Sequence, residues 1–312
     1  MGFQIVKGES LEINGLITLL YGSPSAGKTS TALTASKPIL FDFDGGAQRS
    51  GFRIGKDIVR IHKWEEISSA FSSLESDLAN YDTLIIDTVE TCLDFIRISI
   101  ENADYKMKAN KLQMYGRMKD EFYGFLSRIT KMGKNVILIA HATTEEQNGV
   151  QRTTPKITGG SKDIVFQKSD FIGYMRIINN KRTVDFNPTD YYEGKNSANL
   201  PLLNIPDFKT EANWFQSIIE KMTLALKATQ AEQDKALIAI NEWKDKIDNC
   251  TLDEANLYIE EMKKLSGAMK SQVWAILKNY AEGAGWIFDK DATEFVLPVQ
   301  AETANEEEFT FE

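Results

Sequence analysis

The sequence has few of the residues that build disulfide-bonded or zinc-binding proteins. Its 312 residues include only two cysteines, Cys92 and Cys250, and two histidines, His62 and His141. The cysteines are far apart and form no CxxC pair, so neither a disulfide framework nor a thiolate metal site is indicated. With so few thiolate and imidazole groups, a zinc site is not expected.

Long apolar runs are also missing. No run approaches the roughly 20 residues that a membrane-spanning helix needs, and the N-terminal residues MGFQIVKGES lack the apolar stretch of a signal peptide. We therefore expect a cytoplasmic chain with no membrane partner. Hydrophobic residues make up 42% of the sequence and charged residues 26%, a balance typical of a folded globular protein.

Acidic residues outnumber basic ones, but the excess is unevenly distributed along the chain. Residues 1–210 contain 26 Lys and Arg against 25 Asp and Glu, whereas residues 211–312 contain 10 against 20. The net charge of -9 therefore belongs to the C-terminal third. Residues 97–134 hold nine basic and four acidic residues, an excess that can face phosphates. The alternative for this stretch is a solvated helix face of mixed charge.

Short apolar runs recur along the first two-thirds of the chain. They predict strands at residues 16–21, 38–43, 57–61, 83–87 and 136–140. Helices are expected after the glycine-rich turn at 22–27 and at residues 64–79, 90–105 and 112–132. This alternation predicts an α/β domain of the doubly wound class, with a mainly parallel sheet covered by helices on both faces.

The pattern changes after residue 140. Residues 141–161 are rich in Thr, Gly, Gln and Lys without an apolar period, which predicts a long functional loop. A hairpin is expected at residues 171–186 around Asn179-Asn180, followed by an irregular connector at 187–208. From 211 to about 284 the pattern is helical, with Thr251 and Glu254 spaced as a capping box.

These patterns divide the chain into three expected parts. They are an α/β domain at 1–210, a small helical accessory domain at 211–298 and an acidic disordered tail at 299–312. We expect the aromatic residues of the helical domain to form its core; they are Trp243, Tyr258, Trp274, Tyr280 and Trp286. The tail ends in EEEFTFE, which either solubilises the chain or docks on a basic groove.

The strongest motif is GSPSAGKT, which matches GxxxxGK[ST] between a predicted strand and a predicted helix. In this arrangement backbone N–H groups and the positive helix end surround phosphate oxygens. Lys28 is expected to reach the β and γ phosphates of ATP, and Thr29 to bind Mg²⁺. The expected nucleotide-contacting residues are Gly22, Ser23, Pro24, Ser25, Ala26, Gly27, Lys28, Thr29 and Ser30.

Carboxylates end two of the predicted strands. Asp87 follows the apolar residues LII, a position from which a carboxylate can hold Mg²⁺ opposite Thr29. Asp42 and Asp44 lie in FDFDGG, where strand alternation places both on the same side. One of them can orient the attacking water; the other interpretation is that they only begin a glycine-rich turn.

With these motifs in order, the chain resembles the RecA-like phage ATPases known as phage nucleotide-binding proteins, which include single-strand annealing recombinases of the Sak type. The resemblance covers about residues 12–200 and rests on GSPSAGKT, ILFDFDGG, TLIIDT and VILIAHATTEE. It implies a RecA-like fold, with Asp44 as the catalytic base and His141 as the residue that senses the γ phosphate. Without the resemblance, His141 is a strand-end histidine satisfied by solvent or backbone.

The resemblance also implies that the segment after residue 140 faces single-stranded DNA. Arg152, Lys156 and Lys162 are the candidate DNA-binding residues there, with the backbone N–H groups of 159–160. The segment has no aromatic residue for base stacking. The resemblance also implies a homo-oligomeric ring or filament. In it Lys181, Arg182 or Lys195 can reach the nucleotide of a neighbouring subunit; the alternative is that these are solvated surface residues.

The sequence therefore predicts an ATPase, stimulated by DNA, that couples Mg-ATP to binding or annealing of single strands in phage recombination within the host cytoplasm. One alternative is a nucleotide-gated module that loads or regulates a replication or single-strand-binding protein without its own DNA activity. The other is a small-molecule kinase, because a P-loop alone does not distinguish transfer to water from transfer to a hydroxyl.

Overall fold

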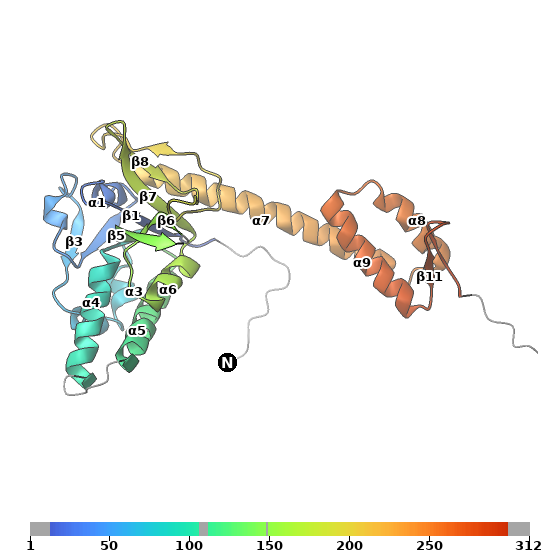
Figure 1. Ribbon diagram of the computed structural model, residues 1–312, viewed down its shortest axis with the longest axis horizontal. Helices are drawn as coiled ribbons and strands as arrows, with labels where there is room; N and C mark the ends of the chain where they lie inside the picture. Colours follow the sequence, from blue (N-terminus) through green and yellow to red (C-terminus); the bar gives the residue numbers. More distant parts are fainter. Residues whose placement is uncertain (1–12, 106–111, 148, 299–312) are drawn as a thin grey trace, which may run out of the picture. The chain divides into compact units, whose positions relative to one another are not determined.

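The computed structural model describes residues 13–105, 112–147 and 149–298 (Figure 1). Its main sheet has the order β10-β8-β7-β1-β5-β4-β2-β3. The bounds are β1 (Ile17–Gly22), β2 (Pro38–Asp42), β3 (Asp57–Arg60), β4 (Thr83–Asp87), β5 (Asn135–Gln147), β7 (Phe171–Ile178), β8 (Lys181–Asp185) and β10 (Leu203–Asn204). The strands from β3 to β7 in this order run parallel. Antiparallel pairing adds β8 and β10, and also β6 (Val150–Pro155) and β9 (Lys195–Asn196).

Both faces of the sheet are covered by helices, because the central strands are apolar on both sides. Leu19 and Leu20 are each fully buried, yet they belong to different core clusters. The Leu19 face packs on α2 (Glu65–Ser68), α3 (Leu74–Asp77), α4 (Val89–Ile100), α5 (Leu112–Lys131) and α6 (Gly160–Lys168). The Leu20 face packs on α1 (Lys28–Ala32) and the beginning of α7 (Trp214–Ile247). The predicted fold class is confirmed.

The helical part beyond the sheet forms its own core. It contains α8 (Leu252–Met262), α9 (Gly267–Gly283) and a small hairpin of β11 (Ile287–Asp289) and β12 (Glu294–Val296), which the sequence did not indicate. The capping box of Thr251 and Glu254 is confirmed. All five aromatic residues expected in this core belong to it or pack against it. The acidic tail, 299–312, lies outside the described residues.

The two compact units divide within α7. Of the described residues, one unit contains those up to Ala228 and the other contains those from Thr229 to 298. Phe215 and Met222 are fully buried against the sheet, so the beginning of α7 belongs to the α/β unit although it follows the expected boundary between 210 and 211. No helix of the described ranges is long and apolar enough to cross a membrane.

Two expected elements are wrong. The helix expected at 64–79 is two short helices, α2 and α3, separated by a serine-rich stretch. Around the start of α3 the Ser73 hydroxyl donates to the Ala70 carbonyl and the Ser76 hydroxyl donates to the Ser73 carbonyl. Such local side-chain bonds compete with the backbone hydrogen bonds of a continuous helix. The loop expected at 141–161 is instead the end of β5, its antiparallel partner β6 and the start of α6. Short 3₁₀ and π turns complete the unit at η1 (Ala47–Arg49) and η2 (Glu101–Tyr105).

Candidate nucleotide-binding site

The glycine-rich motif forms a loop between the end of β1 and the start of α1. Gly22 has no room for a side chain, because an added Cβ would collide with the Met175 carbonyl of the neighbouring strand. Gly27 has a φ of 90°, in the left-handed region that favours glycine. Most of the loop lines a cavity of about 590 Å³. Ala26 instead packs into the core.

Lys28 holds its ammonium at the loop. It is 7% exposed, and its Nζ donates to the carbonyls of Gly22 and Ser23 at 2.9 and 3.0 Å. Burial lowers the pKa of Lys28, while the negative charges of Asp87, Glu90 and Asp44 oppose that change. The arrangement places a positive charge at the glycine-rich loop, and its role toward phosphate stays a prediction from the motif.

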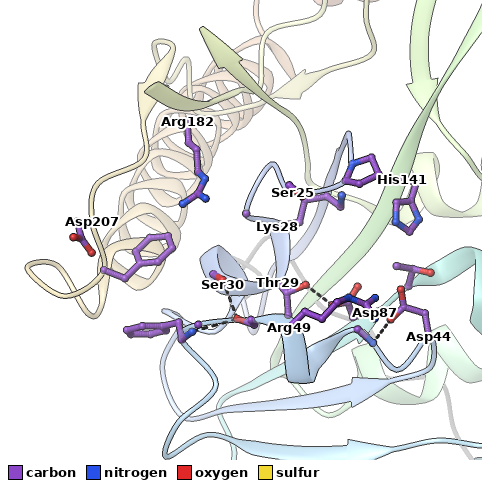
Figure 2. A pocket seen from close by; sticks show the side chains of 18 of the residues that line it. Ser25, Lys28, Thr29, Ser30, Asp44, Arg49, Asp87, His141, Arg182 and Asp207 are labelled. Carbon is purple, nitrogen blue, oxygen red and sulfur yellow. Dashed lines mark hydrogen bonds between the residues drawn. The ribbon is translucent and has the colours of Figure 1, made fainter. Parts of the chain in front are cut away.

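Thr29 and Asp87 come together at the adjacent strand end. The Thr29 hydroxyl donates to Asp87 Oδ2 at 2.6 Å (Figure 2). Asp87 is 3% exposed, and burial raises its pKa to about 6; the charges of Asp44 and Asp42 act in the same direction, whereas the Thr29 hydrogen bond and Lys28 oppose it. A buried carboxylate whose charged form is unfavourable is a good partner for a cation.

The donor set suits Mg²⁺ together with a nucleotide. A hydroxyl and one carboxylate are the protein oxygens that Mg²⁺ commonly uses when phosphates supply further ligands. Within the described residues there is no cluster of three or more His, Cys, Asp and Glu that could hold a metal ion alone. The residues therefore fit a magnesium ion that arrives with ATP.

Asp42 and Asp44 have different environments although both accept from the Gly46 N–H, at 3.0 and 2.7 Å respectively. Asp42 is 1% exposed, and burial raises its pKa. Asp44 is exposed and lines the cavity. Of the two carboxylates, Asp44 is therefore the one that can reach water beside a bound phosphate, while Asp42 supports the turn.

His141 lines the same cavity from β5, where it pairs in register with Gly22. Its backbone N–H donates to Glu90 Oε1 at 3.1 Å, and its ring Nδ1 contacts the same oxygen. The sequence interpretation missed Glu90, because an acidic residue in the first turn of a helix is commonplace. Glu90 fixes the orientation of the His141 ring.

Arg182 approaches the P-loop of its own chain. Figure 2 shows its side chain extending from β8 toward the loop. A Cβ added at Gly27 would lie 3.2 Å from Arg182 Cδ. Arg182 is exposed and lines the cavity. The sequence suggested Arg182 for a neighbouring subunit's nucleotide; in the structure its side chain lies at the cavity of its own chain.

The far end of the cavity is aromatic. Phe52 and Phe208 line it, with ring centroids 5.5 Å apart, and the Lys56 ammonium lies 5.4 Å from the Phe52 ring. The Ser30 and Ser50 hydroxyls are hydrogen-bonded at 2.8 Å, and both residues line the cavity. Neither Phe52 nor Phe208 was singled out from the sequence, because no motif marks them.

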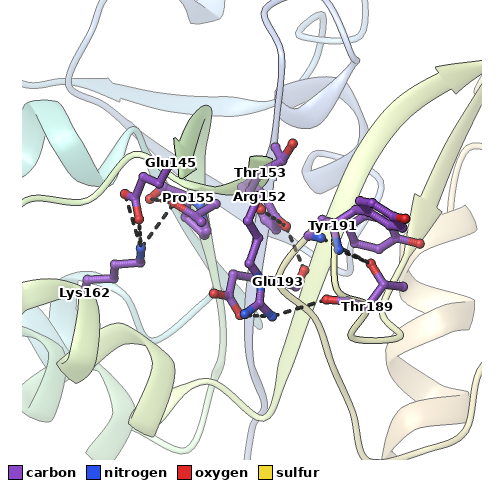
Figure 3. A network of polar contacts seen from close by, with 11 residues as sticks. Glu145, Arg152, Thr153, Pro155, Lys162, Thr189, Tyr191 and Glu193 are labelled. Atoms are coloured by element: carbon purple, nitrogen blue, oxygen red, sulfur yellow. Dashed lines mark hydrogen bonds and ion pairs between the residues drawn. The ribbon is translucent and has the colours of Figure 1, made fainter. Parts of the chain in front are cut away.

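Two of the three candidate DNA-binding residues, Arg152 and Lys162, are held in ion pairs (Figure 3). Arg152 forms an ion pair with Glu193 at 3.2 Å. Lys162 forms one with Glu145 at 3.1 Å. Lys156 is exposed, and its backbone N–H donates to the His141 carbonyl at 2.8 Å. Of the three, Lys156 is the residue most open to an external phosphate.

The remaining basic candidates lie elsewhere. Lys195 donates to the Ser169 carbonyl at 2.5 Å and so supports the sheet. In the basic stretch 97–134, the side chains of Arg97 and Arg117 pair with acidic residues of the same stretch. Lys106, Lys108 and Lys111 lie outside the described residues.

The chain contains a strand-loop-helix motif with a buried lysine, a threonine-aspartate pair and a cavity beside them. Together these features define a P-loop nucleotide-binding domain. The chain belongs to the AAA domain family, whose model matches residues 14–198. The SPbeta prophage-derived uncharacterized protein YorG of Bacillus subtilis (strain 168) is 20% identical over 267 residues, which cover 81% of this chain and 79% of YorG.

A crystal structure of the RadB recombinase aligns with 56% of this chain and 84% of its own at 15% identity, with a TM-score of 0.34. At this TM-score the likeness supports no inference about function.

Proposed function

We propose that the protein is a Mg-ATP-dependent ATPase whose nucleotide state controls the binding or annealing of single-stranded DNA in phage recombination. One observation carries the nucleotide part: Lys28, the Thr29–Asp87 pair and Asp44 converge on one cavity. Phosphoryl transfer requires mainly positioning and charge neutralisation, and these groups supply both.

The residues divide the work as follows. Lys28 binds the β and γ phosphates, and Asp44 orients the attacking water as general base. Thr29 and Asp87 hold Mg²⁺, which neutralises phosphate charge when bound. Arg182 adds a second cation from the same chain, so hydrolysis needs no residue from a neighbour. A ring or filament remains an expectation from the resemblance to RecA-like phage ATPases.

The aromatic end of the cavity suits the base of the nucleotide. Phe52 and Phe208 offer apolar ring surface on which a purine can stack. Ser30 and Ser50 line the same cavity, and their hydroxyls can serve as hydrogen-bond partners for sugar and α-phosphate oxygens. This division into a charged end and an aromatic end supports a nucleoside triphosphate as the ligand.

The coupling to DNA has a physical route through β5. This strand passes His141 at the cavity and continues into the β5–β6 hairpin. The Tyr21 hydroxyl, on the residue before the P-loop, donates to the Glu193 carbonyl at 2.7 Å, next to that hairpin. A shift of the P-loop can therefore move the hairpin. The resemblance to Sak-type recombinases and the prophage origin of YorG support single-stranded DNA as the partner.

The test is ATP turnover with and without a long single-stranded oligonucleotide, at low and moderate salt because phosphate contacts are screened. Stimulation by the strand, abolished in Lys28→Ala, is the expected result. Turnover that is equally fast in Lys28→Ala would disprove the assignment of the site.

A nucleotide-gated module without its own DNA activity is the second candidate. The specific observation in its favour is that Glu193 neutralises Arg152 of β6 and Glu145 neutralises Lys162 of α6, both in the segment that was expected to face DNA. In that case turnover would be indifferent to single strands and would respond to a replication or single-strand-binding protein.

A further inference from the structure

The exposed face that joins α5 and α6 contains the aromatic residues that the β5–β6 hairpin lacks. Tyr115 and Tyr123 of α5 are 49% and 51% exposed. They lie eight positions apart with Lys119 midway, so all three occupy one helix face. At a rise of about 1.5 Å per residue, the two rings are about 12 Å apart along the helix. We call Tyr115, Lys119, Tyr123 and Lys168 the tyrosine platform.

Two ammonium groups accompany the rings. The Lys168 Nζ of α6 lies 4.6 Å from the Tyr123 ring centroid, a cation–π contact that orients the ring. Lys119 lies against the start of α6, where a Cβ added at Gly160 would be 3.4 Å from its Nζ. In the described part of the chain, no carboxylate lies within ion-pair distance of Lys119 or Lys168. Both charges are therefore available to an external anion.

We propose that the tyrosine platform binds single-stranded nucleic acid by stacking two bases, two nucleotide steps apart, on Tyr115 and Tyr123, with a phosphate between them at Lys119. This inference rests on the proposed function and specifies the surface that contacts the strand. Alternating rings and cations match a chain that alternates bases and phosphates. Asp120 and Asp163 on the same helices limit the net charge, so stacking rather than ion pairing supplies most of the affinity.

Stacking on an oriented ring gives a testable magnitude. One base on one aromatic ring contributes enough affinity that its removal weakens binding about 5-fold or more. Tyr115→Ala with Tyr123→Ala should therefore weaken binding of a fluorescein-labelled oligothymidylate by about 25-fold or more, if the two sites are independent. Tyr115→Phe with Tyr123→Phe keeps both rings and should bind within about 2-fold of the unaltered protein.

The salt dependence tests the lysine separately. Lys119→Gln should lower the slope of log affinity against log salt by about 0.7, the value for one phosphate of a single strand. Unstimulated ATP turnover should be unchanged in every variant, because none of these side chains lines the nucleotide cavity. That turnover also reports that each variant is folded.

The outcomes separate this inference from the proposed function. If the alanine pair binds strands as the unaltered protein does, or the phenylalanine pair loses as much affinity as the alanine pair, the platform is wrong and the ATPase proposal stands. If the unaltered protein binds no single strand in any nucleotide state at low salt, DNA is not the partner and both DNA proposals fail. Turnover and its dependence on Lys28 would then still test the ATPase.

Discussion

Asp87→Asn should stabilise the protein in the absence of nucleotide and Mg²⁺, although it removes a proposed metal ligand. Burial raises the pKa of Asp87 from 3.8 to about 6, so the folded state binds the proton more tightly than the unfolded chain. The free energy of unfolding therefore falls as the pH rises through the window from 3.8 to about 6. Above this window the charged carboxylate costs about 3 kcal/mol, at 1.36 kcal/mol per pKa unit.

Asparagine removes that cost and still accepts the Thr29 hydrogen bond. We expect Asp87→Asn to raise the free energy of unfolding by up to about 3 kcal/mol at pH 7.5, which corresponds to roughly 6–12 °C in the melting temperature of a unit of this size. The gain should shrink as the pH is lowered through 6 and nearly vanish near pH 4.

The assay is thermal unfolding of both proteins in EDTA, followed by circular dichroism from pH 5 to 7.5. Asp44→Asn is the matched control, because Asp44 lines the same cavity but is exposed, and its effect should stay below about 1 kcal/mol. The reasoning is refuted if Asp87→Asn is less stable than the unaltered protein at pH 7.5. It is also refuted if the gain does not depend on pH.

Three further predictions concern turnover. Lys28→Ala should lower kcat by about 100-fold or more, while the thermal unfolding curve stays close to that of the unaltered protein. Near-normal turnover would contradict the role of Lys28 in binding phosphate. Asp44→Asn should lower kcat by about 10²–10⁴-fold while ATP still binds, and survival of hydrolysis would reduce Asp44 to a structural residue. Arg182→Ala should lower kcat by about 10²-fold or more, with partial recovery in Arg182→Lys because lysine supplies only a point charge. Because Arg182 acts within its own chain, turnover per protomer should not change with protein concentration. A rise in turnover on concentrating the protein would mean that the catalytic cation comes from a neighbouring subunit.

The phosphate end of the site could be predicted because its determinants are local. The P-loop is a contiguous motif that dictates its own backbone, and Asp87 follows a strand whose apolar residues are evident. The sheet order then brings Thr29 and Asp87 together, 58 positions apart. By contrast, Arg182 and Phe208 reach the cavity only through the placement of β8 and the connector after β10, which no local pattern indicates.

The β5–β6 hairpin was missed for a different reason. The second half of β5 and the whole of β6 are polar and threonine-rich, so apolar periodicity did not reveal them. The sequence does contain a signal, since Asn148-Gly149 is a dipeptide typical of two-residue hairpin turns, and Gln147 pairs with Val150 across it. Weighing turn chemistry above periodicity would have predicted the hairpin. The ion pairs of Arg152 with Glu193 and of Lys162 with Glu145 join the hairpin to other segments, so a hairpin prediction alone would not have revealed them.

The most direct test of the central claim is the affinity for a labelled single strand in three states: with Mg²⁺ and a non-hydrolysable ATP analogue, with Mg-ADP, and without nucleotide. Control of strand binding by the nucleotide predicts affinities that differ by about tenfold or more between the ATP-like and ADP states, a coupling of about 1.4 kcal/mol. The difference should be lost in Lys28→Ala. Equal affinity in all three states, or no binding in any of them, would contradict the claim.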